Sequence, residues 1–166
     1  MNIYHWNRSH RAAFTLIEMI VVIGIVAAIV MVTVPNLLGK RNTGDLKNTA
    51  TQIAALLRQA QNDSMAQKNG LSWGVHFQNT TATAPFYAFF SSSSSAYNAS
   101  GIAGYYRLPN TVSYLTSTLS SGSSLDVVFS QILGSASAST SIGLYLISSS
   151  SQQSIISVAS SGAVNY

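Results

Sequence analysis

The chain has 166 residues, a formal net charge of +4 and no cysteine. The lack of cysteine excludes a disulfide framework, thiolate metal sites and a cysteine nucleophile. If a leader and a membrane segment are subtracted, the remaining residues are enough for about one small domain.

Residues 14–34 form an apolar stretch of membrane length that contains one carboxylate, Glu18. As a helix this stretch would span roughly 32 Å, which is enough to cross a bilayer. A charged side chain in such a segment costs roughly 2.5–3.5 kcal/mol on insertion scales, so Glu18 is expected to have a purpose and a partner.

This apolar stretch has two ordinary explanations. Residues 1–28 could be a secretory signal that is cut after Ala28, or the stretch could be a plain single-pass anchor. The apolar run is longer than the roughly 7–15 residues of a signal core, and a carboxylate inside that core is unexpected. Basic residues stand on both sides of the stretch, so charge alone does not fix its orientation.

A basic leader, a small residue and then Phe14-Thr15-Leu16-Ile17-Glu18 before an apolar helix resemble the start of type IV prepilins and pseudopilins. The resemblance implies that a prepilin peptidase cuts between Ala13 and Phe14 on the cytoplasmic side and methylates the new amine of Phe14. Ala13 stands where the family usually has glycine. Residues 1–13 would then be the leader, and residues 14–38 the transmembrane and assembly helix.

Glu18 and Pro35 take their expected roles from the same resemblance. Glu18 would neutralise the Phe14 amine of a sister subunit during assembly, while the amine of its own helix, about one turn away, is a competing partner. Pro35 lies where the helix of this family bends, and proline removes a backbone donor. Loss of the leader removes Arg8 and Arg11, so the net side-chain charge falls from +4 to +2.

Residues 39–70 are predicted to form the amphipathic half of the same long helix. Asp45 or Thr43 could cap its start, and Gly70 marks its end. Apolar residues recur at intervals of three and four, as expected for a helix stripe that packs on a core. The stripe consists of Leu46, Ala50, Ile53, Ala54, Leu57 and Ala60.

Beyond Gly70 the apolar period changes to two, which predicts strands. Over residues 71–78, Trp73, Val75 and Phe77 point one way and polar residues the other, which indicates a half-buried strand. Further strands are predicted at 86–90, 112–116, 125–129, 142–147, 154–159 and 163–166.

The segments between these strands are rich in Ser, Thr, Asn and Gly, notably residues 79–85 and 91–104, and are predicted to be connections. A turn is expected at residues 160–162. Seven antiparallel strands packed on one helix predict an α+β fold with a β-rich head over residues 71–166. The resemblance identifies this arrangement with the pilin fold.

The tail is similar to minor pseudopilins of the H type. The similarity rests on residues 108–112, on 127–130 with Gly134, and on 155–158 with 162–164. It implies a strand-turn-strand at the carboxyl end and a minor role in the filament. Major pseudopilins commonly carry an Asp-rich calcium loop, and this sequence shows none, which also favours a minor subunit.

No catalytic, metal or cofactor site is predicted. His76 is the only histidine that remains after leader removal, so three histidine or cysteine ligands of the zinc kind are not available. A triad of His76, Asp126 and one of many serines can be written down, but no Gly-x-Ser-x-Gly elbow accompanies it. We therefore expect no enzyme activity.

The main rival function is DNA capture by a minor pilin of a competence system. That function needs clustered Lys and Arg on the head. From residue 69 onward the only formally charged side chains are Arg107 and Asp126, so nucleic acid is not an expected partner.

The sequence thus predicts a structural pilin-like subunit of a type IV pilus or a type II secretion pseudopilus. The implied partners are prepilin peptidase, sister pilins, an inner-membrane platform protein, the assembly ATPase and, before assembly, membrane lipid. The expected location is the bacterial cytoplasmic (inner) membrane in a single pass, with the head outside the cytoplasm, and later a periplasmic or cell-surface filament. The pilus, secretion and competence systems are not separated by these features.

Overall fold

The computed structural model describes residues 15–94 and 96–166, and for residues 32–40 it describes the helical backbone alone. The chain divides into two units, residues 1–39 and residues 40–166. In chain order the elements are α1 (Leu16–Met65), the 3-10 turn η1 (Lys68–Gly70), β1 (Ser72–Gln78), β2 (Phe86–Ser92), the 3-10 turn η2 (Ala99–Gly101), β3 (Ile102–Arg107), β4 (Val112–Tyr114), β5 (Ser124–Phe129), β6 (Thr140–Leu146), β7 (Ser149–Val158) and β8 (Val164–Asn165).

α1 is one continuous helix, so the predicted cap at Thr43 or Asp45 is wrong. No helix starts there; the carboxylate of Asp45 instead accepts a hydrogen bond from Thr111 Oγ1 at 3.0 Å. The backbone is helical through Pro35, and a bend at that residue stays a prediction.

The α-helix ends at Met65, five residues before the predicted end at Gly70. Gln67 and Asn69 have φ values of 50° and 59°, which lie in the left-handed region. Because residues in that region cannot continue a right-handed helix, the chain closes into η1 instead.

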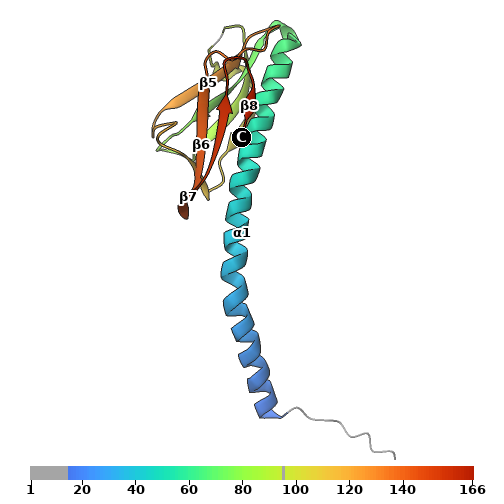
Figure 1. The fold of residues 1–166 in the computed structure, drawn as a ribbon, viewed down its shortest axis with the longest axis vertical. Coiled ribbons are helices and arrows are strands. Elements are labelled where there is room, and N and C mark those ends of the chain that lie inside the picture. The colour runs from blue at the N-terminus through green and yellow to red at the C-terminus, as the bar shows by residue number, and fades with distance from the viewer. Residues whose placement is uncertain (1–14, 95) are drawn as a thin grey trace, which may run out of the picture. The chain divides into compact units, whose positions relative to one another are not determined.

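The strands form two four-stranded antiparallel sheets rather than one sheet of seven strands (Figure 1). The first sheet has the order β3-β2-β1-β5 and the second has the order β4-β6-β7-β8. The two sheets share one core with α1, to which the whole predicted helix stripe contributes buried side chains. The predicted α+β class is therefore confirmed.

α1 is also fixed to each sheet by a polar contact. The hydroxyl of Tyr87 on β2 donates to Gln52 Oε1 at 2.9 Å. The guanidinium of Arg58 donates to the carbonyl of Val164 on β8 at 2.9 Å. Residues 40–166, which contain these bonds and the core, form one compact unit.

β3 was not predicted, because residues 91–104 are expected to be a connection. The strand pairs with β2, and Tyr106 lies opposite Tyr87 with the two rings stacked at 5.3 Å. Tyr106 therefore covers the core, whereas Tyr105 is half exposed on the other face.

β1 is buried on both faces, so the prediction of a half-buried strand is wrong. Trp73, Val75 and Phe77 pack in the core as expected. On the opposite face His76 is also buried, because the ring of Tyr97 from the following loop stacks on it at 3.7 Å between centroids.

The carboxyl end has the predicted strand-turn-strand. β7 and β8 pair antiparallel, and the amide of Gly162 donates to the carbonyl of Ala159 at 2.8 Å. Gly162 has φ +91°, and a Cβ there would collide with the carbonyl oxygen of Gly134. Only glycine satisfies both conditions at this turn.

Candidate functional site

The N-terminal motif is described from Thr15 onward, so the predicted cleavage residues Ala13 and Phe14 lie outside the described residues. The amide of Glu18 donates to Thr15 Oγ1 at 3.3 Å, and the amide of Met19 donates to the Thr15 carbonyl at 3.3 Å. Thr15 therefore caps the first turn of α1. The cap was not predicted, although the spacing Thr-x-x-Glu before an apolar run is a sequence signal for it.

Glu18 is exposed in the first turn of α1. A carboxylate at this position interacts favourably with the partial positive charge of the helix N-terminus. Within the described residues the Glu18 carboxylate takes part in neither of the ion pairs of the structure, which join Lys68 to Asp63 and His76 to Asp126. Its predicted pairing with an amine is not tested by a single chain.

The described part of α1 before residue 32 consists almost entirely of exposed apolar side chains. The large ones are Leu16, Ile17, Met19, Ile20, Val21, Val22, Ile23, Ile25, Val26, Ile29, Val30 and Met31. They occur on every side of the helix, which is the pattern of a helix covered by lipid or by other helices.

The described residues contain no helix that combines the length and the hydropathy needed to cross a bilayer. The predicted transmembrane segment 14–38 is thus not found as a spanning helix within them. Phe14 and the side chains of residues 32–38 lie outside the described part of that segment.

On the head, the structure brings together two residues of the hypothetical triad. His76 lies opposite Asp126 across β1 and β5, and His76 Nδ1 contacts Asp126 Oδ1 at 2.5 Å. Within the described residues no serine is hydrogen-bonded to His76, whose ring is covered by Tyr97. Burial raises the pKa of the Tyr97 hydroxyl, and the Asp126 carboxylate raises it further. The His76–Asp126 pair therefore has the geometry of a packed contact, and Tyr97 stacks on it from its loop.

The basic side chains of residues 58–107 lie at separate places rather than in one cluster. Arg58 lies over the ring of Tyr166 as well as bonding to β8. Lys68 pairs with Asp63 at 2.9 Å and lies over the ring of Trp73. Arg107 is exposed at the end of β3. This distribution does not form the positive stripe that nucleic-acid binding needs.

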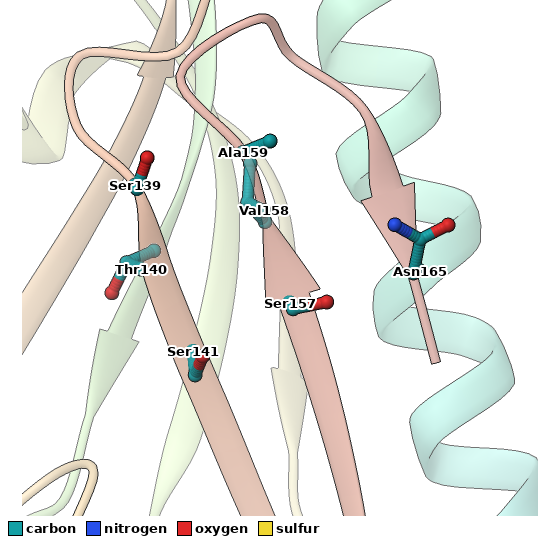
Figure 2. A pocket seen from close by; sticks show the side chains of 7 residues that line it. All are labelled: Ser139, Thr140, Ser141, Ser157, Val158, Ala159 and Asn165. Atoms are coloured by element: carbon teal, nitrogen blue, oxygen red, sulfur yellow. The ribbon is translucent and has the colours of Figure 1, made fainter.

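Two further features concern metal and ligand binding. No group of three or more His, Cys, Asp or Glu side chains lies close enough to hold a metal ion in the part of the chain that the structure describes. An open groove with a volume of about 470 Å³ crosses β6, β7 and β8 (Figure 2). It is lined by Ser139, Thr140, Ser141, Ser157, Val158, Ala159 and Asn165.

The register of the second sheet explains the polar character of this groove. Ser141 lies opposite Ser157, and Ser157 lies opposite Asn165, so the three side chains form a row across the strands. The lining is uncharged and contains no titratable group. It provides hydroxyl and amide groups to solvent but no acid, base or nucleophile with an activating partner.

Comparison with known proteins bears on the N-terminal region. Residues 8–34 match the prokaryotic N-terminal methylation motif. This match includes Ala13, Phe14 and Glu18, and it supports a place for the chain among type IV pilins and pseudopilins. The chain therefore carries the motif of a pilin-like subunit that prepilin peptidase processes.

The features expected outside residues 8–34 agree with this family to different degrees. A helix packed on antiparallel sheets is consistent with a pilin fold. Pilin-type proteins are structural, which agrees with the expectation that the chain is not an enzyme. The match ends at residue 34 and does not reach the tail on which the H-type similarity rests. Neither the curated proteins nor the solved structures gave a match to the chain.

Proposed function

We propose that the protein is a structural pilin-like subunit that is cut before Phe14, held in the inner membrane and then assembled into a filament outside the cytoplasm. The observation that carries this proposal is the methylation motif at residues 8–34. The motif coincides with a helix segment whose large apolar side chains are exposed in the described structure. Such a surface is stable only beside lipid or beside other apolar helices.

Membrane insertion is the proposed first cover for this surface. The support is the family motif and the apolar run from Met19 to Val32, since the described helix alone does not meet the length and hydropathy needed to span a bilayer. In the filament, helices of sister subunits would replace the lipid. The platform protein and the assembly ATPase belong to this proposal as the machinery that moves the subunit out of the membrane.

Glu18 is proposed as the residue that sets the position of each subunit in the filament. Cleavage would leave a positive amine on Phe14, and the carboxylate of a neighbouring subunit could neutralise it. Pairing the two charges lowers the free energy of burying both among apolar helices. A contact that depends on two atoms of two chains also selects one axial register between them.

The minor role is a finer proposal. Its support is the similarity of the tail to H-type minor pseudopilins and the lack of an Asp-rich loop in the sequence. The choice between a pilus and a secretion pseudopilus has no support of its own in the described structure. DNA capture in a competence system has less support, because the basic side chains are dispersed.

The start of the mature chain tests the proposal. Mass spectrometry of protein from a host with its own prepilin peptidase should give a chain that begins at a methylated Phe14. Ala13→Gly should keep cleavage and a bulky Ala13→Leu should block it. Ala28→Leu is the matched control, because it would block an ordinary signal peptidase and should leave this cut unchanged. A chain that begins at Ile29, or one that keeps Met1, would overturn the proposal.

A further inference from the structure

Three Asn-x-Ser/Thr tripeptides follow the proposed cut before Phe14, at residues 62–64, 79–81 and 98–100. A fourth, at residues 7–9, falls in the leader and lies outside the described residues. This pattern is the acceptor for N-linked glycosylation, in which a saccharide is added to an asparagine on the surface of an exported protein. The structure distinguishes the three tripeptides, because an acceptor needs an accessible asparagine Nδ2 atom and a Ser or Thr hydroxyl that is not engaged elsewhere.

The tripeptides that begin at Asn79 and Asn62 do not meet these two conditions. Asn79 is 6% exposed, and its Nδ2 atom donates to the carbonyl of Leu119 at 2.8 Å. Asn62 is exposed on α1, but Ser64 is fully buried. Ser64 Oγ accepts a hydrogen bond from the amide of Trp73 at 2.7 Å and donates to its carbonyl at 3.3 Å. Using either tripeptide would leave a buried polar group without its partner, which costs free energy.

The tripeptide that begins at Asn98 meets both conditions. Asn98 is exposed, and it precedes η2 with an extended backbone of φ −134° and ψ 121°. Its Oδ1 atom accepts hydrogen bonds from the amide of Ser100 at 3.0 Å and from the Ser100 hydroxyl at 2.8 Å. Both bonds use the carbonyl end of the side chain, and no hydrogen bond among the described residues uses its Nδ2 atom. The nitrogen that would accept a saccharide is therefore available beside the hydroxyl that the pattern requires.

The position of this tripeptide on the head is fixed by its neighbour Tyr97. The ring of Tyr97 stacks on His76 at 3.7 Å and meets the ring of Phe90 edge-on at 5.1 Å, both measured between centroids. His76 lies on the face of β1 that is opposite the core shared with α1. A saccharide on Asn98 would therefore stand on the solvent side of the first sheet and leave the packing of α1 on the core unchanged.

We propose that Asn98 is the acceptor of an N-linked saccharide. The donor is a saccharide carried on a lipid pyrophosphate, and the catalyst is a membrane-bound oligosaccharyltransferase that acts outside the cytoplasm. Nδ2 attacks the anomeric carbon, so that an N–C bond forms and the bond from this carbon to the phosphate oxygen breaks. The lipid pyrophosphate leaves, and Nδ2 gives one proton to a base of the transferase. The inference rests on the proposed function, because only a head outside the cytoplasm meets such a transferase.

Mass spectrometry of the mature chain from its native host tests the proposal. Trypsin cuts after Lys68 and Arg107, and it should release residues 69–107 as one peptide because no other Lys or Arg lies between them. This peptide contains both Asn79 and Asn98, so its fragment ions are needed to assign the modified residue. The expected result is a saccharide mass on Asn98 and none on Asn79.

Four variants of the full-length chain test the two groups of the acceptor. Asn98→Gln and Ser100→Ala should lose the saccharide mass, since the first removes the acceptor and the second removes the hydroxyl. Ser100→Thr keeps a hydroxyl at this position and should keep the mass. Asn62→Gln is the matched control, because it removes an exposed asparagine of the same tripeptide pattern on α1, and it should leave the mass unchanged.

The other outcomes contradict the inference in different ways. A mass that persists in Asn98→Gln, or a saccharide found on a serine of residues 91–95 in its place, would overturn the assignment to Asn98. A mature chain that begins at Phe14 and has an unmodified Asn98 would also overturn it and would leave the proposed function standing. A chain that keeps Met1 and carries no saccharide would overturn both.

Discussion

The apolar side chains at the two ends of α1 differ in burial. Before residue 32 the large apolar side chains are exposed in the part of the chain that the structure describes. After residue 45 the helix turns a narrow apolar stripe toward two sheets and buries it completely. One continuous helix therefore contains a segment that depends on partners and a segment that depends on its own head. The comparison predicts that substitutions in the two segments will affect different measurements.

The largest effect on folding is expected in the buried stripe. Leu57→Ala removes a fully buried side chain from the shared core and should lower the free energy of unfolding by about 2–5 kcal/mol. Val22→Ala, in the exposed segment of the same helix, should leave that free energy unchanged. Urea denaturation of the full-length chain in mild detergent measures both. Equal losses from the two variants would show that the segments fold as one unit.

The next largest effect is expected on assembly. Glu18→Val should reduce incorporation into filaments at least tenfold, because the amine of a neighbour then lacks its carboxylate, while urea denaturation stays as in the wild type. Glu18→Gln should behave in the same way, since it keeps the size and loses the charge. Quantification of sheared filaments measures the loss. Wild-type assembly by Glu18→Val would remove Glu18 from the docking mechanism.

A smaller change of opposite sign is expected in the loop of residues 130–135 that follows β5. Ile132 has φ 69°, which a β-branched residue rarely adopts. Ile132→Gly should raise the free energy of unfolding by about 1 kcal/mol, because glycine adopts this conformation without the strain of a β-branched side chain. Ile147→Gly is the control and should not stabilise the fold. Thermal denaturation measures both variants, and a loss of stability in Ile132→Gly would contradict the assignment of strain.

An effect of similar size is expected at Tyr87 of β2, whose hydroxyl donates to Gln52 of α1. Burial raises the pKa of Tyr87 to about 12, and the nearby Tyr106 adds to the shift. In the unfolded chain tyrosine loses its proton near pH 10. From about pH 10 upward the unfolded state therefore releases a proton that the folded state keeps, and stability falls as the pH rises.

Tyr87→Phe tests this pH dependence. The variant loses the hydrogen bond to Gln52 and should be less stable by about 1 kcal/mol at neutral pH. Its stability should then decline less steeply between pH 10 and 12 than that of the wild type. Urea denaturation across this range measures the difference, and parallel declines would show that Tyr87 is not the titrating group.

Several elements were predictable because local pattern and tertiary packing agree. The stripe from Leu46 to Ala60 has helical period, and the strand containing Trp73 has a period of two, so each element could be identified from its own residues. The turn at Gly162 was predictable because its residue type fits the backbone. The N-terminal motif is local as well, and its match covers one contiguous segment.

Other features depend on residues that are distant in the sequence. β3 follows a serine-rich segment and contains Gly104, and only its pairing with β2 makes it a strand. The burial of His76 depends on Tyr97, which reaches it from a loop. The positive φ of Ile132 carries no sequence signal, because a β-branched residue is the last residue type expected in that conformation.

The cap at Thr15 has a consequence for the timing of maturation. Among the described residues, the first hydrogen bonds of α1 are made by Thr15 and by residues after it, all of which remain when a cut falls before Phe14. Removal of the leader would then change the charge and length of the chain end without unwinding the helix. Proteolysis and helix formation would be independent events, so a subunit that waits in its uncut form would need no refolding when the peptidase releases it.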